Sequence, residues 1–388
     1  MATFIHTADW QLGKPFSRVA DADSRARLKQ QRLDSVRRIG EVVRARGAEF
    51  VVVAGDLFDS NRPTPATVSA ACDAIAAIGV PVYAIPGNHD HGGPECVWDQ
   101  RHFRDECRER APNLHVLLDE TPVETEGAIL LPCPLQRRHT SSDPCRWIGD
   151  LDFATLDDRP RIVVAHGSTV DFTGESDDED LTGQPNFIDL ARLPAIDVDY
   201  VALGDWHGFV HAGGKAWYAG SHETDRFPRP GQLTGRVACV TATRGGTPLV
   251  EALPHGRTLW LSHTQTFSDD DGPQLLDQTL SSLTASHGPQ QSLLDISLGG
   301  SLGLAARARL DRVLETWGAR LLDLRLVREV TLAPRGEEIE ALRRRGDPLI
   351  AHVADELVAR LGAGGEEAAI AGTALAVLHG LVSEGGEQ

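Results

Sequence analysis

Short apolar runs alternate with amphipathic stretches in the first part of the chain. Residues 4–8, 49–54 and 80–85 form continuous runs that include β-branched residues, which is typical of strands buried on both faces. Between them, residues 24–46 and 64–79 place apolar side chains at helical spacing. This alternation predicts an α/β fold that begins with a largely parallel sheet.

The later part of the chain continues with strands and then becomes helical. Residues 95–110 predict a charged helix. The segments 161–167 and 200–208, which are largely apolar at first and end on polar groups, predict two more buried strands. A polar stretch at 268–272 predicts a domain boundary. We therefore expect a first domain at 1–265, a small α+β domain at 274–333 and a helical segment at 334–388.

Five strand-like runs end on side chains that can bind metal ions or phosphate. These side chains are Asp9, Gln11, Asp56, Asp59, Asn88, His89, Asp90, His166, Asp205 and His207. In open α/β sheets, ligands gather beyond the carboxyl ends of the strands. We therefore expect the five ends to converge on one site.

The order of these motifs resembles the calcineurin-like metallophosphoesterase signature. The motifs are Asp9-x-Gln11, Gly55-Asp56-x-x-Asp59, Gly87-Asn88-His89-Asp90, Ala165-His166-Gly167 and Gly204-Asp205-x-His207. More narrowly, the segments IHTADWQLGKPF, VAGDLFDSNRPTP and AIPGNHD look like the SbcD-type DNA-repair exonucleases. The resemblance covers most of residues 1–260. It implies a metallophosphoesterase-type β-sandwich flanked by helices, with a small α+β capping domain and C-terminal helices.

The resemblance also implies two divalent ions about 3.5 to 4 Å apart. Asp56 would bridge them, and the other implied ligands are Asp9 and His207 for the first ion and Asn88 and His166 for the second. His89 would contact the phosphate and assist the leaving oxygen as a general acid.

Two positions depart from the family pattern. Gln11 and Asp205 stand where the family usually has histidines. We include both among the metal ligands, because Gln11 can offer a carboxamide oxygen and Asp205 a carboxylate. With Asp9 and Asp56 the site then carries three carboxylates, so we expect Mn²⁺, or Mg²⁺, in preference to zinc.

Four nearby residues allow two interpretations each. Asp59 and Asp90 either orient a neighbouring imidazole or cap a helix. His222, just after a turn that resembles one of the family, either contacts substrate or is an ordinary loop residue. Trp206 either stacks on a splayed base or packs against the core.

The chain is acidic, with a formal net charge of −18 over 388 residues. This charge argues against general coating of nucleic acid, which relies on a basic surface. Residues 18–46 are locally basic and either follow a phosphate backbone or form a solvated helix face. The acidic run at 175–180 either is a mobile loop or borders the mouth of the site.

The six cysteines form no CxxC pair, which disfavours zinc-ribbon and thioredoxin-like sites. The sequence has neither a signal-peptide pattern at its start nor an apolar stretch of membrane-spanning length. We therefore expect a cytoplasmic protein that has no membrane partner.

The most direct interpretation is a metal-dependent phosphodiesterase that acts as a DNA nuclease in DNA repair or end processing. The nucleophile would be a metal-bound hydroxide. Two alternatives stay open: a phosphodiesterase of small molecules such as cyclic nucleotides, and a scaffold subunit with weakened catalysis. The resemblance implies DNA as a partner, a homodimer, and an SMC-like coiled-coil ATPase that docks on the C-terminal helices.

Overall fold

The structure is a computed structural model that describes residues 1–172, 186–193, 197–344, 348–363 and 365–384. The acidic run at 175–180 lies outside the described residues. The chain divides into two compact units, Met1–Thr258 and Leu259–Gln388, which are described separately.

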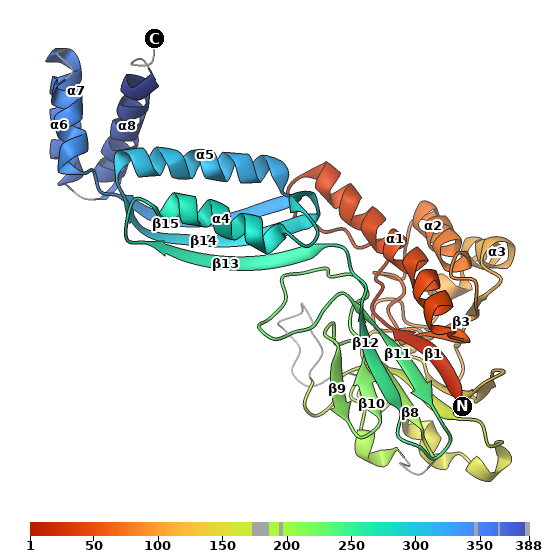
Figure 1. The fold of residues 1–388 in the computed structure, drawn as a ribbon. Helices are drawn as coiled ribbons and strands as arrows, with labels where there is room; N and C mark the ends of the chain where they lie inside the picture. Colours follow the sequence, from red (N-terminus) through yellow and green to blue (C-terminus); the bar gives the residue numbers. More distant parts are fainter. Residues whose placement is uncertain (173–185, 194–196, 345–347, 364, 385–388) are drawn as a thin grey trace. The chain divides into compact units, whose positions relative to one another are not determined.

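The first unit contains two six-stranded sheets (Figure 1). The first sheet has the order β12-β11-β1-β2-β3-β4 and consists of β1 (Ala2–Thr7), β2 (Phe50–Val53), β3 (Val82–Ala84), β4 (Leu114–Val116), β11 (Arg236–Ala242) and β12 (Leu249–Pro254). Its strands β1 to β4 are parallel, as predicted, whereas β11 and β12 add an antiparallel edge.

The second sheet has the order β5-β6-β7-β8-β10-β9. Its strands are β5 (Val123–Glu124), β6 (Ile129–Cys133), β7 (Arg161–His166), β8 (Tyr200–Gly204), β9 (Val210–Gly213) and β10 (Ala216–Tyr218). The four central strands β6, β7, β8 and β10 run parallel, so their carboxyl ends lie at one edge of the sheet.

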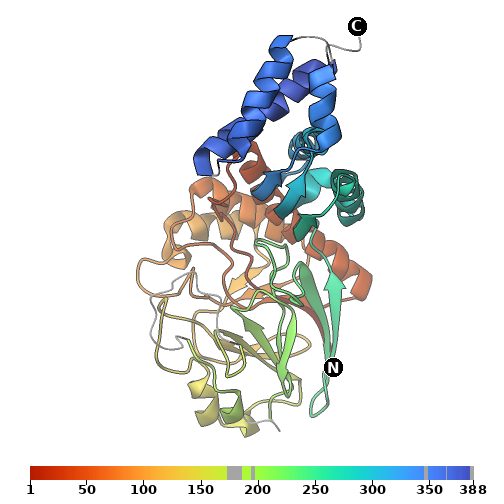
Figure 2. The same ribbon diagram turned by 90° about the vertical axis from the view of Figure 1, so that its left-hand side faces the viewer.

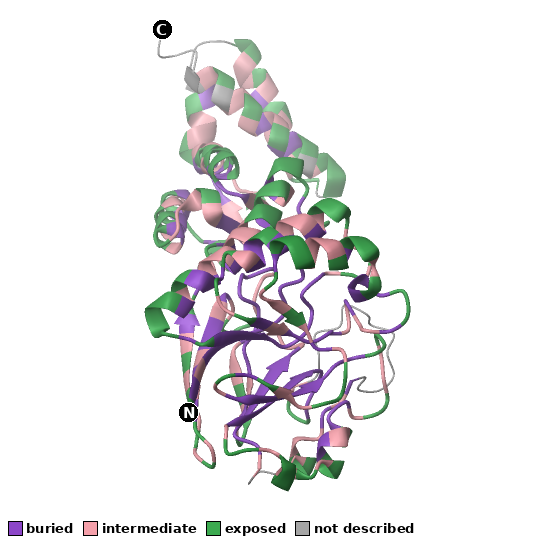
Figure 3. Cartoon of the chain, turned by 90° about the vertical axis from the view of Figure 1, so that its right-hand side faces the viewer, coloured by how far each residue is buried: buried purple, intermediate pink, exposed green. Residues whose placement is uncertain are grey.

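The core of this unit has two sides because successive residues of a strand face opposite ways. In β2, Val52 packs with Phe4 and Tyr200 between the two sheets. Val51 and Val53 pack instead with apolar residues of the helices. Figure 3 shows the strands as the buried centre and the exposed positions largely on the helices. This arrangement confirms the predicted β-sandwich flanked by helices.

Three helices cover the outer face of the first sheet: α1 (Ala22–Arg46), α2 (Pro65–Ala76) and α3 (Arg101–Arg110). Helix α1 ends at Arg46, as predicted, and its C-cap Gly47 has φ 62° and donates its N–H to Val43 O. The helix expected at 95–110 begins only at Arg101. Residues Val97–Asp99 form a separate 3-10 turn, because Gln100 is extended and interrupts the helix.

Short 3-10 turns also occur elsewhere in the described chain, at Arg146–Asp150, Phe153–Thr155, Leu190–Arg192 and Pro289–Gln291.

His6 is a buried imidazole of β1 that makes stability depend on pH. Its Nδ1 lies 2.9 Å from the hydroxyl of Tyr200, and burial lowers its pKa from 6.5 to about 3. Between these values the unfolded chain binds a proton that the folded chain does not, so this group destabilises the fold as the pH falls below 6.5.

The His6→Asn variant should therefore become more stable relative to the wild type as the pH falls. Relative to the variant, the wild type is expected to lose about 2 kcal/mol of unfolding free energy between pH 6.5 and 5. Urea denaturation at pH 7.5 and pH 5 measures this difference. An identical loss in both proteins on acidification would contradict the assignment.

The second unit contains a parallel sheet in the order β13-β14-β15, formed by β13 (Leu259–Phe267), β14 (Ser292–Leu302) and β15 (Asp323–Leu332). Its two crossover helices are α4 (Gly272–Thr284) and α5 (Leu304–Arg320). Alternate residues of β14 share a core with both helices. Figure 1 draws α4 and α5 beside the three strands. Because β13 pairs along its length with β14, the second unit starts at Leu259, before the expected boundary.

Three helices end the second unit: α6 (Gly336–Arg344), α7 (Pro348–Leu361) and α8 (Gly365–Glu384), drawn in blue in Figure 2. They share a small core that includes Leu304, Leu342, Ala354 and Leu375. No helix in the described part of the chain is both long enough and apolar enough to cross a membrane.

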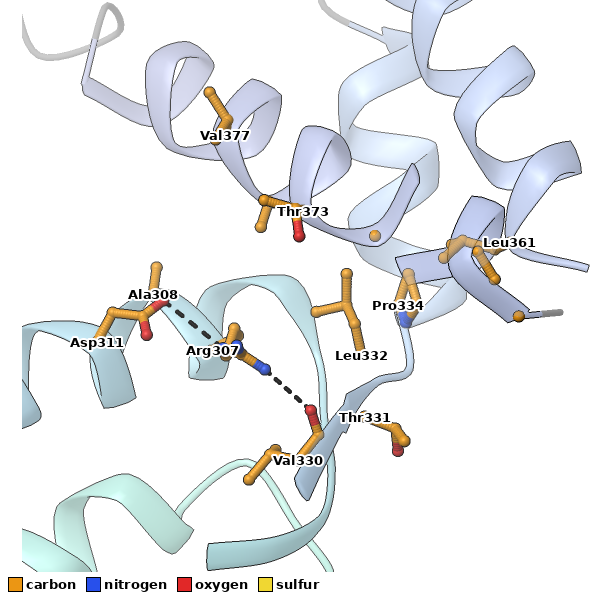
Figure 4. Close-up of a pocket in the computed structure, with 14 residues that line it drawn as sticks. Arg307, Ala308, Asp311, Val330, Thr331, Leu332, Pro334, Leu361, Thr373 and Val377 are labelled. Atoms are coloured by element: carbon orange, nitrogen blue, oxygen red, sulfur yellow. Dashed lines mark hydrogen bonds and ion pairs between the residues drawn. The ribbon is translucent and has the colours of Figure 1, made fainter. Parts of the chain in front are cut away.

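A cavity of about 670 Å³ lies in the second unit among α5, β15, α7 and α8 (Figure 4). Leu332, Leu361 and Val377 line it, and Arg307 on its edge donates to Val330 O at 3.0 Å. None of the predicted metal ligands lines this cavity.

Candidate metal centre

The predicted site residues lie where strands of both sheets of the first unit end. Asp9 and Asp56 follow β1 and β2, and Asn88 follows β3. His166 is the last residue of β7, and Asp205 directly follows β8. The site therefore draws side chains from both layers of the sandwich.

Asp9, Asp56 and His166 form the buried centre of the site, with ligand atoms within 4.8 Å of one another. The Nε2 of His166 lies 3.6 Å from Oδ1 of Asp56 and 3.7 Å from Oδ1 of Asp205. Its Nδ1 donates to Ala54 O at 2.8 Å. When the ring is neutral, Nε2 therefore carries a lone pair that faces the carboxylates.

His207 and Asp205 complete the side of the site around Asp9. The Nε2 of His207 is 3.9 Å from Oδ1 of Asp9, and the backbone N–H of Asp205 donates to the same oxygen at 3.2 Å. The Nδ1 of His207 donates to Oδ1 of Asp225 at 3.3 Å. This bond directs Nε2 of His207 toward the site.

Asn88 and His89 approach from the turn after β3. In one amide orientation, Oδ1 of Asn88 lies 2.9 Å from Nε2 of His166. In the other, its nitrogen donates to both carboxylate oxygens of Asp56, at 3.3 and 3.1 Å. The Nδ1 of His89 donates to Asp59 O at 2.8 Å, and its Nε2 is 3.9 Å from Oδ2 of Asp56.

The backbone is strained at this site. Four of the seven described non-glycine residues with positive φ belong to it: Asp9 (53°), Gln11 (40°), Asp56 (56°) and Asp205 (95°). Each such conformation costs on the order of 1 to 3 kcal/mol and persists only where the surroundings impose it. Strain gathered on residues that share one site is typical of functional centres.

Two glycines make the close approach possible. A Cβ on Gly87 would overlap the carboxylate of Asp56. A Cβ on Gly55, which also has φ 87°, would overlap the ring of His166. The glycines of the Gly-Asp and Gly-Asn-His motifs are therefore needed for packing between the ligands.

Charges within the site shift several pKa values. Burial lowers the pKa of His166, but the carboxylates around it outweigh burial and raise it to about 9. Burial raises the pKa of Asp205 to about 6 and also raises that of Asp9. In the metal-free site, protons on His166 and on the carboxylates therefore offset part of the negative charge, and a bound cation would displace these protons.

The donor set fits a divalent cation. Oxygen and imidazole lone pairs from Asp9, Asp56, His166 and Asp205 converge in a buried space, and such groups repel one another unless a cation lies between them. Carboxylate oxygens with imidazole are suitable ligands for Mn²⁺ and Mg²⁺ as well as for other divalent ions.

Gln11 lies at the site, but its carboxamide oxygen does not face the centre. Its Oε1 accepts from Nζ of Lys14 at 2.7 Å. Its Nε2 faces Oδ2 of Asp56 at 3.4 Å and Nε2 of His207 at 3.5 Å. As placed, Gln11 offers the site a donor and no ligand atom.

The remaining candidates take different positions. Asp90 accepts from the backbone N–H groups of Gly87 and Phe58, at 2.8 and 2.9 Å, so it holds the turn that carries Asn88 and His89. Asp59 contacts His89 through its backbone oxygen.

His222 and Trp206 differ in their access to a substrate. His222 is fully buried with Nε2 3.3 Å from Arg32 O, so the structure does not offer its side chain to a substrate. Trp206 is partly buried and packs against Phe172, with ring centres 5.6 Å apart. Its indole lies beside the site without belonging to the ligand set.

Three residues that support the site were not among the predicted site residues: Lys14, Arg32 and Asp225. Buried Arg32 donates to Asp9 O at 2.8 Å, to Trp10 O at 2.9 Å and to Glu223 O at 3.1 Å. Asp225 binds His207, as described. The sequence carries one signal for Asp225. This residue lies in the segment after the strand-like run that ends at Tyr218, just as the other site residues lie after other strands.

Replacing Arg32 should destabilise the first unit strongly. In Arg32→Leu, three buried carbonyls lose their donor, so the free energy of unfolding should fall by about 3 to 5 kcal/mol. Chemical denaturation measures the loss. The control Lys29→Leu, at an exposed position of the same helix, should stay within about 0.5 kcal/mol of wild type. Equal stability of the two variants would refute this role.

Comparison with known proteins agrees with this geometry. Residues 2–234 match the family model described as calcineurin-like phosphoesterase. The uncharacterized metallophosphoesterase YhaO of Bacillus subtilis is 37% identical over 98 residues, 24% of each chain. One subunit of the SbcCD nuclease of the same organism is 31% identical over 91 residues, 22% of each chain.

The other similarities are also partial. DNA double-strand break repair protein Mre11 of Archaeoglobus fulgidus is 33% identical over 91 residues, 22% of this chain and 19% of that protein. The aligned part thus spans about a quarter or less of these relatives' length. A dimetal phosphatase from Danio rerio has a TM-score of 0.38 at 14% identity, over 65% of this chain and 98% of that chain. Because the family model matches more than half of the chain, the protein belongs to the calcineurin-like phosphoesterases, a family of metal-dependent phosphoester hydrolases.

Proposed function

We propose that the protein is a metal-dependent phosphodiesterase that acts as a DNA nuclease in DNA repair or end processing. The observation that carries the proposal is the buried convergence of Asp9, Asp56 and His166 beside a partly exposed His89. Two relatives support the choice of DNA, because their names describe a nuclease subunit and a DNA double-strand break repair protein.

The proposed ligands divide around Asp56, which would lie between two ions. Asp9 and His207 would bind the first ion. The second ion would be bound by Asn88, His166 and Asp205. Bound divalent ions would neutralise charge on the phosphodiester and make water a sufficient nucleophile at neutral pH. With three carboxylates in the set, we propose Mn²⁺ or Mg²⁺, and a metal screen in which zinc alone supports activity would contradict this choice.

His89 is placed to act on the substrate. Its side chain is 32% exposed, and the bond from Nδ1 to Asp59 O leaves Nε2 for an incoming group. Burial lowers the pKa of His89, but the carboxylates of Asp56 and Asp59 outweigh it and raise the pKa. A protonated Nε2 can donate to a phosphate oxygen and give its proton to the leaving oxygen.

The test is a matched assay of the full chain with Mn²⁺ on linear DNA and on a small chromogenic diester. We expect DNA cleavage that chelation of the metal abolishes. Turnover of the diester without any DNA cleavage would replace the nuclease by a phosphodiesterase of small molecules. Absence of bound metal at saturating Mn²⁺, with no cleavage of either substrate, would favour a scaffold subunit.

We also propose a homodimer and an SMC-like coiled-coil ATPase partner that binds the C-terminal helices. Exposed apolar side chains on α7 and α8, at Leu349, Ile370, Val377 and Leu381, support a partner there. The net charge of −18 also supports such a partner. An acidic chain is repelled by the phosphate backbone, so a partner that binds DNA would supply the affinity for it. Light scattering of the chain alone, then with such an ATPase, tests both assemblies.

A further inference from the structure

Lys14 connects two groups at the edge of the proposed metal centre. Its Nζ donates to Oε1 of Gln11 at 2.7 Å and forms an ion pair with Oδ2 of Asp225 at 2.8 Å. The side chain of Lys14 is 18% exposed and that of Asp225 only 2%. Both contacts are therefore largely shielded from water, which makes them stronger than surface ion pairs.

The first contact determines which atom Gln11 presents to the centre. An ammonium group can only donate, so the acceptor oxygen of the amide must face Lys14. The amide nitrogen then points at Asp56 and His207, at 3.4 and 3.5 Å. An amide nitrogen has no lone pair available for a divalent ion, so position 11 supplies no ligand in this arrangement.

The second contact acts on His207 through Asp225. One carboxylate oxygen of Asp225 pairs with Lys14, and the other accepts from Nδ1 of His207 at 3.3 Å. Lys14, with the longer ion pair that Nε of Arg226 makes to Oδ1 of Asp225 at 3.5 Å, keeps the carboxylate in place. Nε2 of His207 then keeps a lone pair toward Asp9.

We propose that Lys14 is a positioning residue that turns the oxygen of Gln11 away from the metal centre and holds Asp225 on His207. Under this proposal the ion next to Asp9 has Asp9, Asp56 and His207 as its protein ligands and binds more weakly than the ion next to His166. The inference rests on the proposed function in one respect, namely that divalent ions bind at this site.

Titration calorimetry of the full chain with Mn²⁺, without DNA, tests the inference. The wild type should bind two ions in steps that differ by at least about tenfold. Lys14→Met should strengthen the weaker step about tenfold, because the freed oxygen of Gln11 can turn inward. In the Gln11→Leu background the same change frees no oxygen and only loosens Asp225 from His207, so the weaker step should not become stronger.

Two controls accompany this cycle. Lys14→Arg keeps charge and donors and should behave as wild type. Gln11→Leu alone removes no ligand and should keep both steps within about threefold of wild type, so the test does not depend on folding of Lys14→Met.

Equal strengthening in both backgrounds would assign the effect to charge alone and overturn the inference. No strengthening, two equally tight ions in the wild type, or a tenfold loss in Gln11→Leu would overturn it too. Failure of any Mn²⁺ to bind the wild type would instead remove the proposed function itself.

Discussion

Asp56→Asn is expected to reduce phosphodiester cleavage by at least about 10³-fold. The bridging position would lose its negative charge, and charge stabilisation by metal ions is worth several kcal/mol, of which about 4 kcal/mol corresponds to this factor. Elemental analysis of the dialysed protein should show loss of bound metal in parallel. The amide is nearly isosteric, so the fold should remain.

The matched control is Asp73→Asn, at a half-exposed carboxylate of α2 that pairs with Arg110. This variant makes the same chemical change away from the ligands and should keep activity and metal content. Full metal content together with full activity in Asp56→Asn would remove Asp56 from the bridging role.

His89→Gln is expected to lower kcat by about 10² to 10⁴-fold while metal affinity stays within about threefold. Gln can still donate a hydrogen bond to phosphate, but it cannot give up a proton to the leaving oxygen. Single-turnover cleavage and a Mn²⁺ titration on the same preparation measure the two quantities. This separation distinguishes a residue that acts on substrate from a metal ligand.

His102→Gln, an exposed substitution in α3, serves as its control and should leave kcat unchanged. Loss of metal in His89→Gln as large as that in Asp56→Asn would show that His89 is a ligand. Unchanged kcat would remove it from the reaction.

The sandwich was predictable because its strands are buried on both faces. Such strands appear in the sequence as unbroken apolar runs, as at residues 50–53 and 162–165, and the first of them alternate with capped helices. Strand β13 was harder to place because many of its residues are polar or partly exposed. Its polar alternation resembles a connection, so the boundary was expected some residues later.

The site was predictable as a set of strand ends but not in its internal contacts. The motif order identified Asp9, Asp56 and His166, which the fold brings together. The orientation of Gln11 depends on Lys14, and that of His207 depends on Asp225. The sequence marks Asp225 as a polar residue after a strand, but it does not show which side chain Asp225 or Lys14 contacts, because these contacts form only when the chain is folded.

The strained backbone of the site has an evolutionary consequence. Natural proteins stand only slightly above the stability that they need, and selection for folding alone would favour glycine at residues with positive φ. Asp9, Asp56 and Asp205 would be among the first side chains to drift once cleavage no longer mattered to the cell. Conservation of these three aspartates in close relatives would therefore indicate that the reaction is still under selection, and a sequence comparison can test this without an assay.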